Sequence, residues 1–146
     1  MNIKIDINEI KKLIPHRDPF LFIENCEIIE IAIEGIGYKK FYSSEYFFQG
    51  HFPDMPIVPG VILIEALAQT AGVVVSKKYT NQNKKTVLFM SVSKAKFRKP
   101  VLPNDNISFH VKCINRVRSV YKFKGEAYNQ DKIKVCESEF SAMINN

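Results

Sequence analysis

The chain has 146 residues and a net charge of +6, with 46% hydrophobic and 25% charged residues. That length is enough for one domain with a hydrophobic core and too short for two ordinary domains, so we expect a single domain over residues 1–146. The composition excludes a disordered chain. The positive charge favours an acidic partner. Nucleic acid is the weaker choice, because the basic residues are spread along the chain without a recognisable nucleic-acid-binding motif.

The cysteines and the amino terminus bear on the cell compartment. Cys26, Cys113 and Cys136 are odd in number and form no C-x-x-C pair, which predicts reduced thiols, although spacing alone leaves a bridge open. The first residues, MNIKIDINEIKK, lack the long apolar core of a secretory signal. We therefore expect a cytoplasmic protein, and an organellar form trimmed of its transit peptide would look the same.

The first third of the chain predicts one short helix followed by strands. Residues 6–14 are predicted to be helical, with Asp6 or Asn8 as the cap, and Pro15 ends the helix. A strand-like run follows Arg17. We interpret the neighbouring Arg17 and Asp18 as a local ion pair. Residues 26–42 alternate enough for two strands, or for one strand bent around its two glycines, Gly35 and Gly37.

A long apolar helix is predicted in the middle of the chain, over about residues 60–77. The preceding turn is rich in glycine and proline, which prevents regular structure from starting before residue 60. The helix is apolar on almost every side, so it should be buried inside other structure. Glu65 and Gln69 interrupt the apolar run, and about 18 residues span roughly 27 Å, so a membrane span is the weaker interpretation.

The remaining chain predicts antiparallel strands. Residues 80–85 should form a loop and residues 86–103 a strand broken near Pro100. Residues 106–130 should form a hairpin that turns around 116–119, and residues 132–144 a closing strand. One long helix with several such strands is an α+β protein. Because the helix is apolar all round, we expect a curved sheet wrapped around it.

The turn and the start of the long helix bring together groups that suit acid–base chemistry. His51 lies in the turn, and Glu65 lies one turn inside the helix, where loss of hydration favours a neutral carboxyl group. The free amides of Gly60 and Val61 at the helix end can hydrogen-bond a carbonyl oxygen. These groups could remove a proton next to a carbonyl and protonate a leaving group. The alternative is a structural histidine on a loop carbonyl and a solvated or paired glutamate.

Three segments resemble, in order, the signature stretches of the FabZ-type 3-hydroxyacyl-[acyl-carrier-protein] dehydratases. They are IPHRDPFLFIE (14–24), FFQGHFPDMPIVPGVILIEALAQTAG (47–72) and KFRKPVLPND (96–105). Asp18 and Glu24 depart mildly from the family pattern, near the expected entrance. The resemblance implies a hot-dog fold, dehydration of a 3-hydroxyacyl thioester without a cofactor, and acyl carrier protein as the acidic partner. It also implies that the histidine and glutamate of one site come from different subunits of a homodimer, assembled further into a trimer of dimers.

The resemblance and the residues together give each group a hypothetical role. His51 would remove the C2 proton, Glu65 would protonate the departing hydroxyl, and the Gly60 amide would polarise the thioester carbonyl. Gln69 would orient Glu65 by a hydrogen bond. Candidates for an apolar acyl tunnel, which core packing explains nearly as well, are Phe48, Phe52, Val58, Val61, Leu88, Phe89 and Phe97.

Other interpretations stay open at this point. A FabA-type dehydratase-isomerase usually carries Asp at the position of Glu65, and a hot-dog thioesterase fits the His51 and Glu65 pair less well. A non-catalytic acyl-binding protein is a third alternative. A metal site built from His16, His51 and Glu65 is rejected because their spacing is not compact. His110 lies in an alternating strand and is interpreted as structural.

Overall fold

The computed structural model describes residues 2–79 and 86–145, which form a mixed α+β domain. The helices in these residues are α1 (Ile7–Leu13), the short 3-10 helix η1 (Tyr46–Gln49) and α2 (Gly60–Ser76). The strands are β1 (Ile3–Ile5), β2 (Asn25–Glu30), β3 (Glu34–Lys40), β4 (Thr86–Phe97), β5 (Asn106–Val117), β6 (Val120–Tyr128) and β7 (Lys134–Asn145). The long helix therefore lies where the sequence predicts it.

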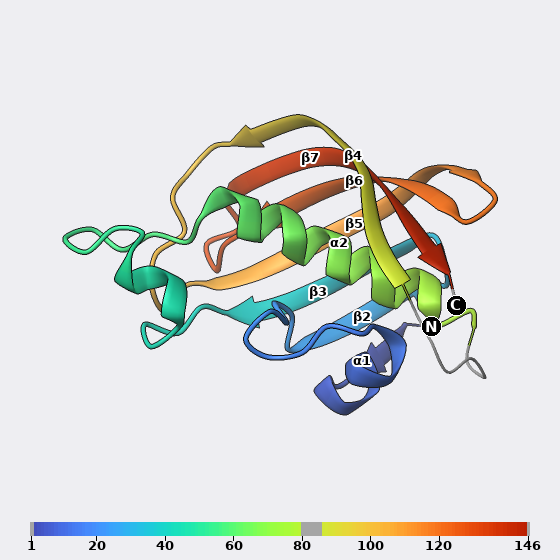
Figure 1. Ribbon diagram of the computed structural model, residues 1–146, viewed down its shortest axis with the longest axis horizontal. Helices are drawn as coiled ribbons and strands as arrows, with labels where there is room; N and C mark the ends of the chain where they lie inside the picture. The colour runs from blue at the N-terminus through green and yellow to red at the C-terminus, as the bar shows by residue number, and fades with distance from the viewer. Residues whose placement is uncertain (1, 80–85, 146) are drawn as a thin grey trace.

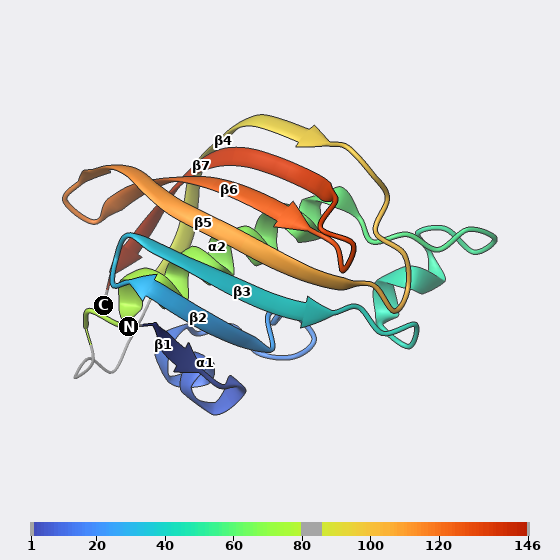
Figure 2. The ribbon, with the colours of Figure 1, turned by 180° about the vertical axis from the view of Figure 1, so that it is seen from behind.

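The described strands form one antiparallel sheet in the order β1-β2-β3-β5-β6-β7-β4. The sheet curves around α2, as Figure 1 shows, and its outer face is seen from behind in Figure 2. The short β1 and the long β4 are its two edges. The predicted α+β hot-dog architecture, a curved sheet around a buried helix, is confirmed.

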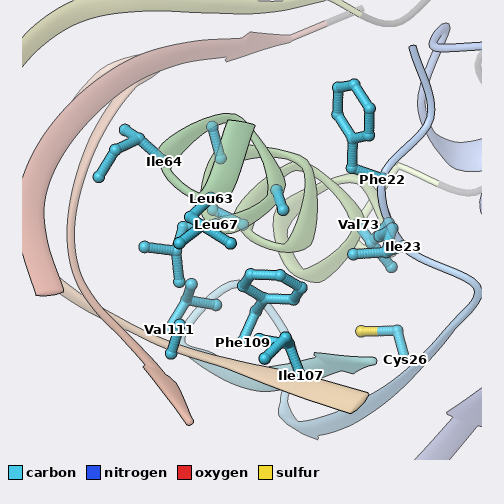
Figure 3. Packing of buried hydrophobic residues seen from close by; sticks show 14 of the residues in the cluster. Phe22, Ile23, Cys26, Leu63, Ile64, Leu67, Val73, Ile107, Phe109 and Val111 are labelled. Carbon is cyan, nitrogen blue, oxygen red and sulfur yellow. The ribbon is translucent and has the colours of Figure 1, made fainter. Parts of the chain in front are cut away.

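The helix is largely enclosed by the chain's own apolar side chains, although Val61 and part of Glu65 stay exposed. From Ile62 to Ser76, each residue of α2 except Glu65 is buried. Leu63, Ile64, Leu67 and Val73 pack against residues of the sheet and of the segment before β2 (Figure 3). Burying such side chains contributes about 1.5–3 kcal/mol each, so the core fixes the helix firmly inside the sheet.

The glycines of β3 allow this close packing. A Cβ atom at Gly37 would lie 2.3 Å from Thr70 Oγ1, and one at Gly35 would lie 2.5 Å from Val74. Of the two alternatives for residues 26–42, two strands are confirmed as β2 and β3, and the bent single strand is not, because both glycines lie within the register of β3 with β5. The chain instead reverses at residues 31–33, where Ala32 has φ 66°.

Other predictions have mixed outcomes. The cap of α1 is confirmed, since Asp6 Oδ1 accepts a hydrogen bond of 2.9 Å from the amide of Glu9. The hairpin is confirmed too, with Arg118 in its turn at φ 57°. The strand predicted after Arg17 begins only at Asn25, and β1 was not anticipated by any pattern. The loop predicted over residues 80–85 lies outside the described residues.

Two further features concern the cysteines and the hydropathy of the helices. The three cysteines are free, and burial raises the pKa of Cys26 and of Cys136 to about 12, so both are held as unreactive thiols. Among residues 2–79 and 86–145, no helix has both the length and the hydropathy to cross a membrane.

Candidate active site

His51 is held by the turn that precedes α2. Its amide donates to the carbonyl of Phe47 at 3.1 Å, and its carbonyl accepts from Ile57 at 2.9 Å. Its Nδ1 lies 3.0 Å from the carbonyl oxygen of Ile57. A carbonyl only accepts hydrogen bonds, so Nδ1 carries the hydrogen and Nε2 of the neutral ring is the basic nitrogen. The ring also stacks on Phe52, with centroids 4.2 Å apart.

Glu65 is held by the amide group of Gln69, as predicted. Gln69 Nε2 donates to Glu65 Oε2 at 3.0 Å and to the carbonyl of Phe20 at 3.0 Å. Its Oε1 accepts from the amide of Phe22 at 2.8 Å. Gln69 is fully buried, so its four hydrogen-bonding positions are largely committed to these partners. The side chain of Glu65 retains 17% exposure, which leaves it accessible from one side.

His16 also contacts Glu65, a contact for which the sequence analysis assigned no role. Its Nε2 lies 3.3 Å from the same oxygen, Oε2. Arg17 holds the backbone here by donating to the carbonyls of Lys11, Ile14 and His16 at 2.8, 3.1 and 2.6 Å. The predicted Arg17–Asp18 pair is not among the ion pairs of the described residues, because the guanidinium caps the end of α1 instead.

A cavity of about 400 Å³ opens at the amino end of α2. Its lining includes several predicted residues, namely His51, Val58, Gly60, Val61 and Phe97. It also includes Arg98 and Lys99, which sequence reasoning left among the general surface charges. The bare Cα of Gly60 lets the Phe97 ring approach the helix end, since a Cβ there would lie 2.5 Å from that ring. The cavity therefore places an imidazole and the first helical amides beside one apolar surface.

Other predicted residues lie outside this cavity. Phe48 is buried in the core against Phe47. Phe52 is half exposed beside His51, and Leu88 and Phe89 are exposed on β4. Glu65 and Gln69 are absent from the lining, and within the described part of one chain no recorded contact joins Glu65 to His51.

The edge strand β4 exposes an apolar surface that starts beside Gly72 of α2 and ends beside Gly60 at the amino end of the helix. Leu88, Met90, Val92 and Phe97 are each about half exposed, and Val61 on the helix is 73% exposed. β4 pairs with β7 on one side, and its other side is a free edge of the described sheet. Such a surface on an unpaired strand edge is typical of a contact with another protein chain.

His110 lies elsewhere. It belongs to β5 and faces the outer surface of the sheet, with Nε2 3.1 Å from Ser108 Oγ and its ring edge-on to Tyr128. Burial lowers the pKa of His110, which keeps the ring neutral. Within residues 2–79 and 86–145, no group of histidine, cysteine and acidic side chains could hold a metal ion.

Comparison with known proteins decides the family. A family model described as "FabA-like domain" matches residues 14–139. The chain belongs to the FabA-like family. It is 45% identical to a 3-hydroxyacyl-[acyl-carrier-protein] dehydratase FabZ of Bradyrhizobium sp. (strain ORS 278), over 96% of this chain and 92% of that protein. A protein of the same description from Caulobacter vibrioides (strain NA1000 / CB15N) is 46% identical, over 96% and 88%.

A solved structure of another protein shares the fold of this chain. The dehydratase heterocomplex ApeI:P from Xenorhabdus doucetiae superposes with a TM-score of 0.75 at 13% identity, covering 94% of this chain and 91% of that chain. At this identity the likeness establishes the shared fold, a curved antiparallel sheet around one long helix.

Proposed function

We propose that this FabA-like protein is a hydro-lyase that dehydrates (3R)-hydroxyacyl-[acyl-carrier-protein] to trans-2-enoyl-[acyl-carrier-protein] in fatty acid elongation. The near full-length similarity to FabZ dehydratases supports this reaction. The observation that carries it within the chain is the bond from His51 Nδ1 to the Ile57 carbonyl, which leaves Nε2 as a base at the cavity.

The elimination needs one base and one acid. His51 Nε2 takes the proton from C2, the C2–C3 double bond forms, and the C3–O bond breaks. Glu65 gives its proton to the departing hydroxyl, which leaves as water. The amide of Gly60 at the start of α2 hydrogen-bonds the thioester oxygen and stabilises the negative charge that develops there. The proton on His51 then returns to Glu65 before the next turnover, so no oxidant, reductant or cofactor enters the balance.

We propose that one complete site uses two chains. His51 lines the cavity of its own chain, whereas Glu65 lies one turn further along α2 than Val61 and is absent from that lining. A second copy paired along the exposed edge of β4 would cover Val61, Leu88 and Phe97 and bring its Glu65 to this cavity. Leu88 and Phe89 could then line an acyl tunnel between the two copies. A homodimer is thus the smallest active unit, and a trimer of dimers is the expected assembly.

The acidic carrier would approach a basic rim. Arg98 and Lys99 line the cavity, and Lys94 and Lys96 precede them on β4. Arg98 is bonded to Glu137 and Lys94 to Glu139, but Lys96 and Lys99 have no recorded carboxylate partner in the described residues. These two free charges are suited to steer an acidic surface to the cavity. We place this reaction in the cytoplasm, where buried free thiols such as Cys26 and Cys136 stay reduced.

The first test is the absorbance of the enoyl thioester formed when the purified protein meets 3-hydroxybutyryl-acyl carrier protein. The wild type should form trans-2-enoyl product, and His51→Ala and Glu65→Gln should each lose about 10²–10⁴-fold in kcat while remaining folded. Full activity in either variant would remove that residue from the mechanism. Formation of a cis-3-enoyl product would instead assign the isomerase activity of the FabA type.

Mixing the two inactive variants tests the shared site. If His51 and Glu65 of one site come from different chains, random exchange of His51→Ala and Glu65→Gln subunits restores about a quarter of the wild-type activity. Half of the dimers are then mixed, and each mixed dimer has one intact site. Each variant incubated alone is the control. No recovery after proven subunit exchange would place both residues of a site in the same chain.

A further inference from the structure

The hydrogen bonds of Gln69 determine that Oε2 of Glu65 is a hydrogen-bond acceptor. Gln69 Oε1 accepts from the amide of Phe22, so the other end of the amide group is the NH₂. That NH₂ donates one hydrogen to the carbonyl of Phe20 and the other to Glu65 Oε2. Because an NH₂ group cannot accept a hydrogen bond from a carboxylic acid, Oε2 is an acceptor whether Glu65 is protonated or ionised.

His16 supplies a second group to the same oxygen. Its Nε2 lies 3.3 Å from Glu65 Oε2, and its side chain is 12% exposed. Its Nδ1 is buried and has no hydrogen-bond partner among the described residues. A hydrogen on Nδ1 would be a buried N–H without an acceptor, which costs more than leaving a lone pair there. Nε2 therefore carries the hydrogen, which points to Oε2.

We infer that His16 is a positioning residue that, with Gln69, keeps the transferable proton of Glu65 on Oε1. The inference rests on the proposed dehydratase function. With two donors at Oε2, this oxygen is the carbonyl oxygen of the neutral acid, and the O–H is left on Oε1, the oxygen with no protein partner recorded in the described residues. After Glu65 gives up its proton, the same two donors stabilise the carboxylate.

The main chain around His16 is built to hold this contact. Arg17 donates to three carbonyl oxygens at the end of α1, including that of His16 itself at 2.6 Å. Phe20 and Phe22, a few residues later, are tied to Gln69 through their backbone. The segment between α1 and β2 has no regular structure, but its backbone is hydrogen-bonded to Arg17 at its start and to Gln69 near its end. This irregular path places the imidazole of His16 next to Oε2 of Glu65.

Two variants of His16 separate positioning from packing. In His16→Phe the ring volume is kept and the donor is lost, so Glu65 can rotate its proton away from the substrate. We expect kcat to fall about 10- to 100-fold with little change in KM, because the substrate is bound by other groups. His16→Gln places an amide hydrogen near the Nε2 position and should recover much of kcat. His110→Phe, at a half-buried histidine on the outer face of the sheet, is the matched control and should retain wild-type kinetics.

An infrared measurement tests the same inference without activity. The carbonyl stretch of protonated Glu65 is the band that disappears in Glu65→Gln. It should move to higher wavenumber in His16→Phe, because the carbonyl oxygen loses a donor, and should return towards the wild-type position in His16→Gln. A band that does not move in His16→Phe, or unchanged kcat in that variant, would overturn the inference. If the band moves in His16→Phe but the wild type shows no dehydratase activity, the positioning role stands and the proposed reaction is rejected.

Discussion

The two halves of α2 differ in how far one chain completes their surroundings. Every residue from Thr70 to Ser76 is buried by the chain's own sheet and α1 segment. In the first half, Val61 is 73% exposed, Glu65 is partly exposed, and the cavity opens beside Gly60. The carboxyl half is thus enclosed by the chain itself, whereas the amino half has one open side, at Gly60, Val61 and Glu65, which we assign to the substrate and to the proposed second copy. The enclosed half anchors this open side.

The largest effect is expected when the same negative charge is introduced into each half of α2. Val74→Asp places an unpaired carboxylate in the fully buried half, which costs about 3–5 kcal/mol or more and should prevent folding. Val61→Asp makes the same change at an exposed position, so the protomer should keep its fold and lose the ability to pair. Circular dichroism and analytical ultracentrifugation measure the two outcomes. Equal loss of structure in both variants would contradict the difference between the halves.

A smaller effect is expected where the sheet touches the buried half. In Gly37→Ala the new Cβ would meet Thr70 Oγ1 at 2.3 Å, so the strand or the helix must shift. We expect a loss of about 1–3 kcal/mol in the free energy of unfolding, measured by urea denaturation. Gly50→Ala is the control, because a Cβ at that position has no neighbour within 4 Å. A stability for Gly37→Ala equal to that control would show that the sheet is not in tight contact with α2.

At the amino half, the charge on Lys99 should affect binding of the acyl carrier protein and not the dehydration step. Lys99→Glu reverses a charge at the cavity rim, and we expect KM for the carrier-bound substrate to rise about 3- to 10-fold. The KM for the same acyl group on a short, uncharged thiol should not change. Lys112→Glu, on the outer face of the sheet, is the matched control. An equal effect of both reversals would indicate attraction by net charge alone.

The smallest effect concerns the ion pairs beside that rim. Hydrogen bonds from Lys134 and Arg98 hold the pKa of Glu137 at about 2, below its usual value of 4.5. The pairs therefore stabilise the fold above about pH 4.5, and this contribution is lost as the pH falls towards 2. The melting temperature of Glu137→Gln should decrease less than that of the wild type between pH 5 and pH 2. Parallel curves for the two proteins would show that these pairs add nothing to stability.

The parts of the fold that depend on local pattern could be predicted from the sequence. The apolar run after Gly60 indicated α2, and alternation with turn residues indicated β5, β6 and β7. For residues 26–42 the sequence left two strands or one bent strand open, because a glycine needed for a close approach to a helix looks the same in sequence as one needed for a bend. Likewise, the three residues of β1 are too few to show a period.

The site was predictable where the motif is contiguous. His51, Glu65 and Gln69 stand in one stretch, so their types and helical spacing could be read directly. The contact of His16 with Glu65 joins residues 49 positions apart through a segment without regular structure, and no periodicity encodes such a path. The hydrogen on His51 Nδ1 likewise depends on where the loop places the carbonyl of Ile57.

The position of α2 between β3 and β5 in the chain has a consequence for synthesis. β3 pairs with β5, and β5 to β7 cover much of the helix, yet the ribosome makes all three strands after α2. During that interval, an almost wholly apolar helix has left the ribosome with only β1 to β3 and α1 to shield it. Slow translation after α2 has emerged would prolong this state and favour aggregation, so the nascent chain is expected to depend on a ribosome-associated chaperone.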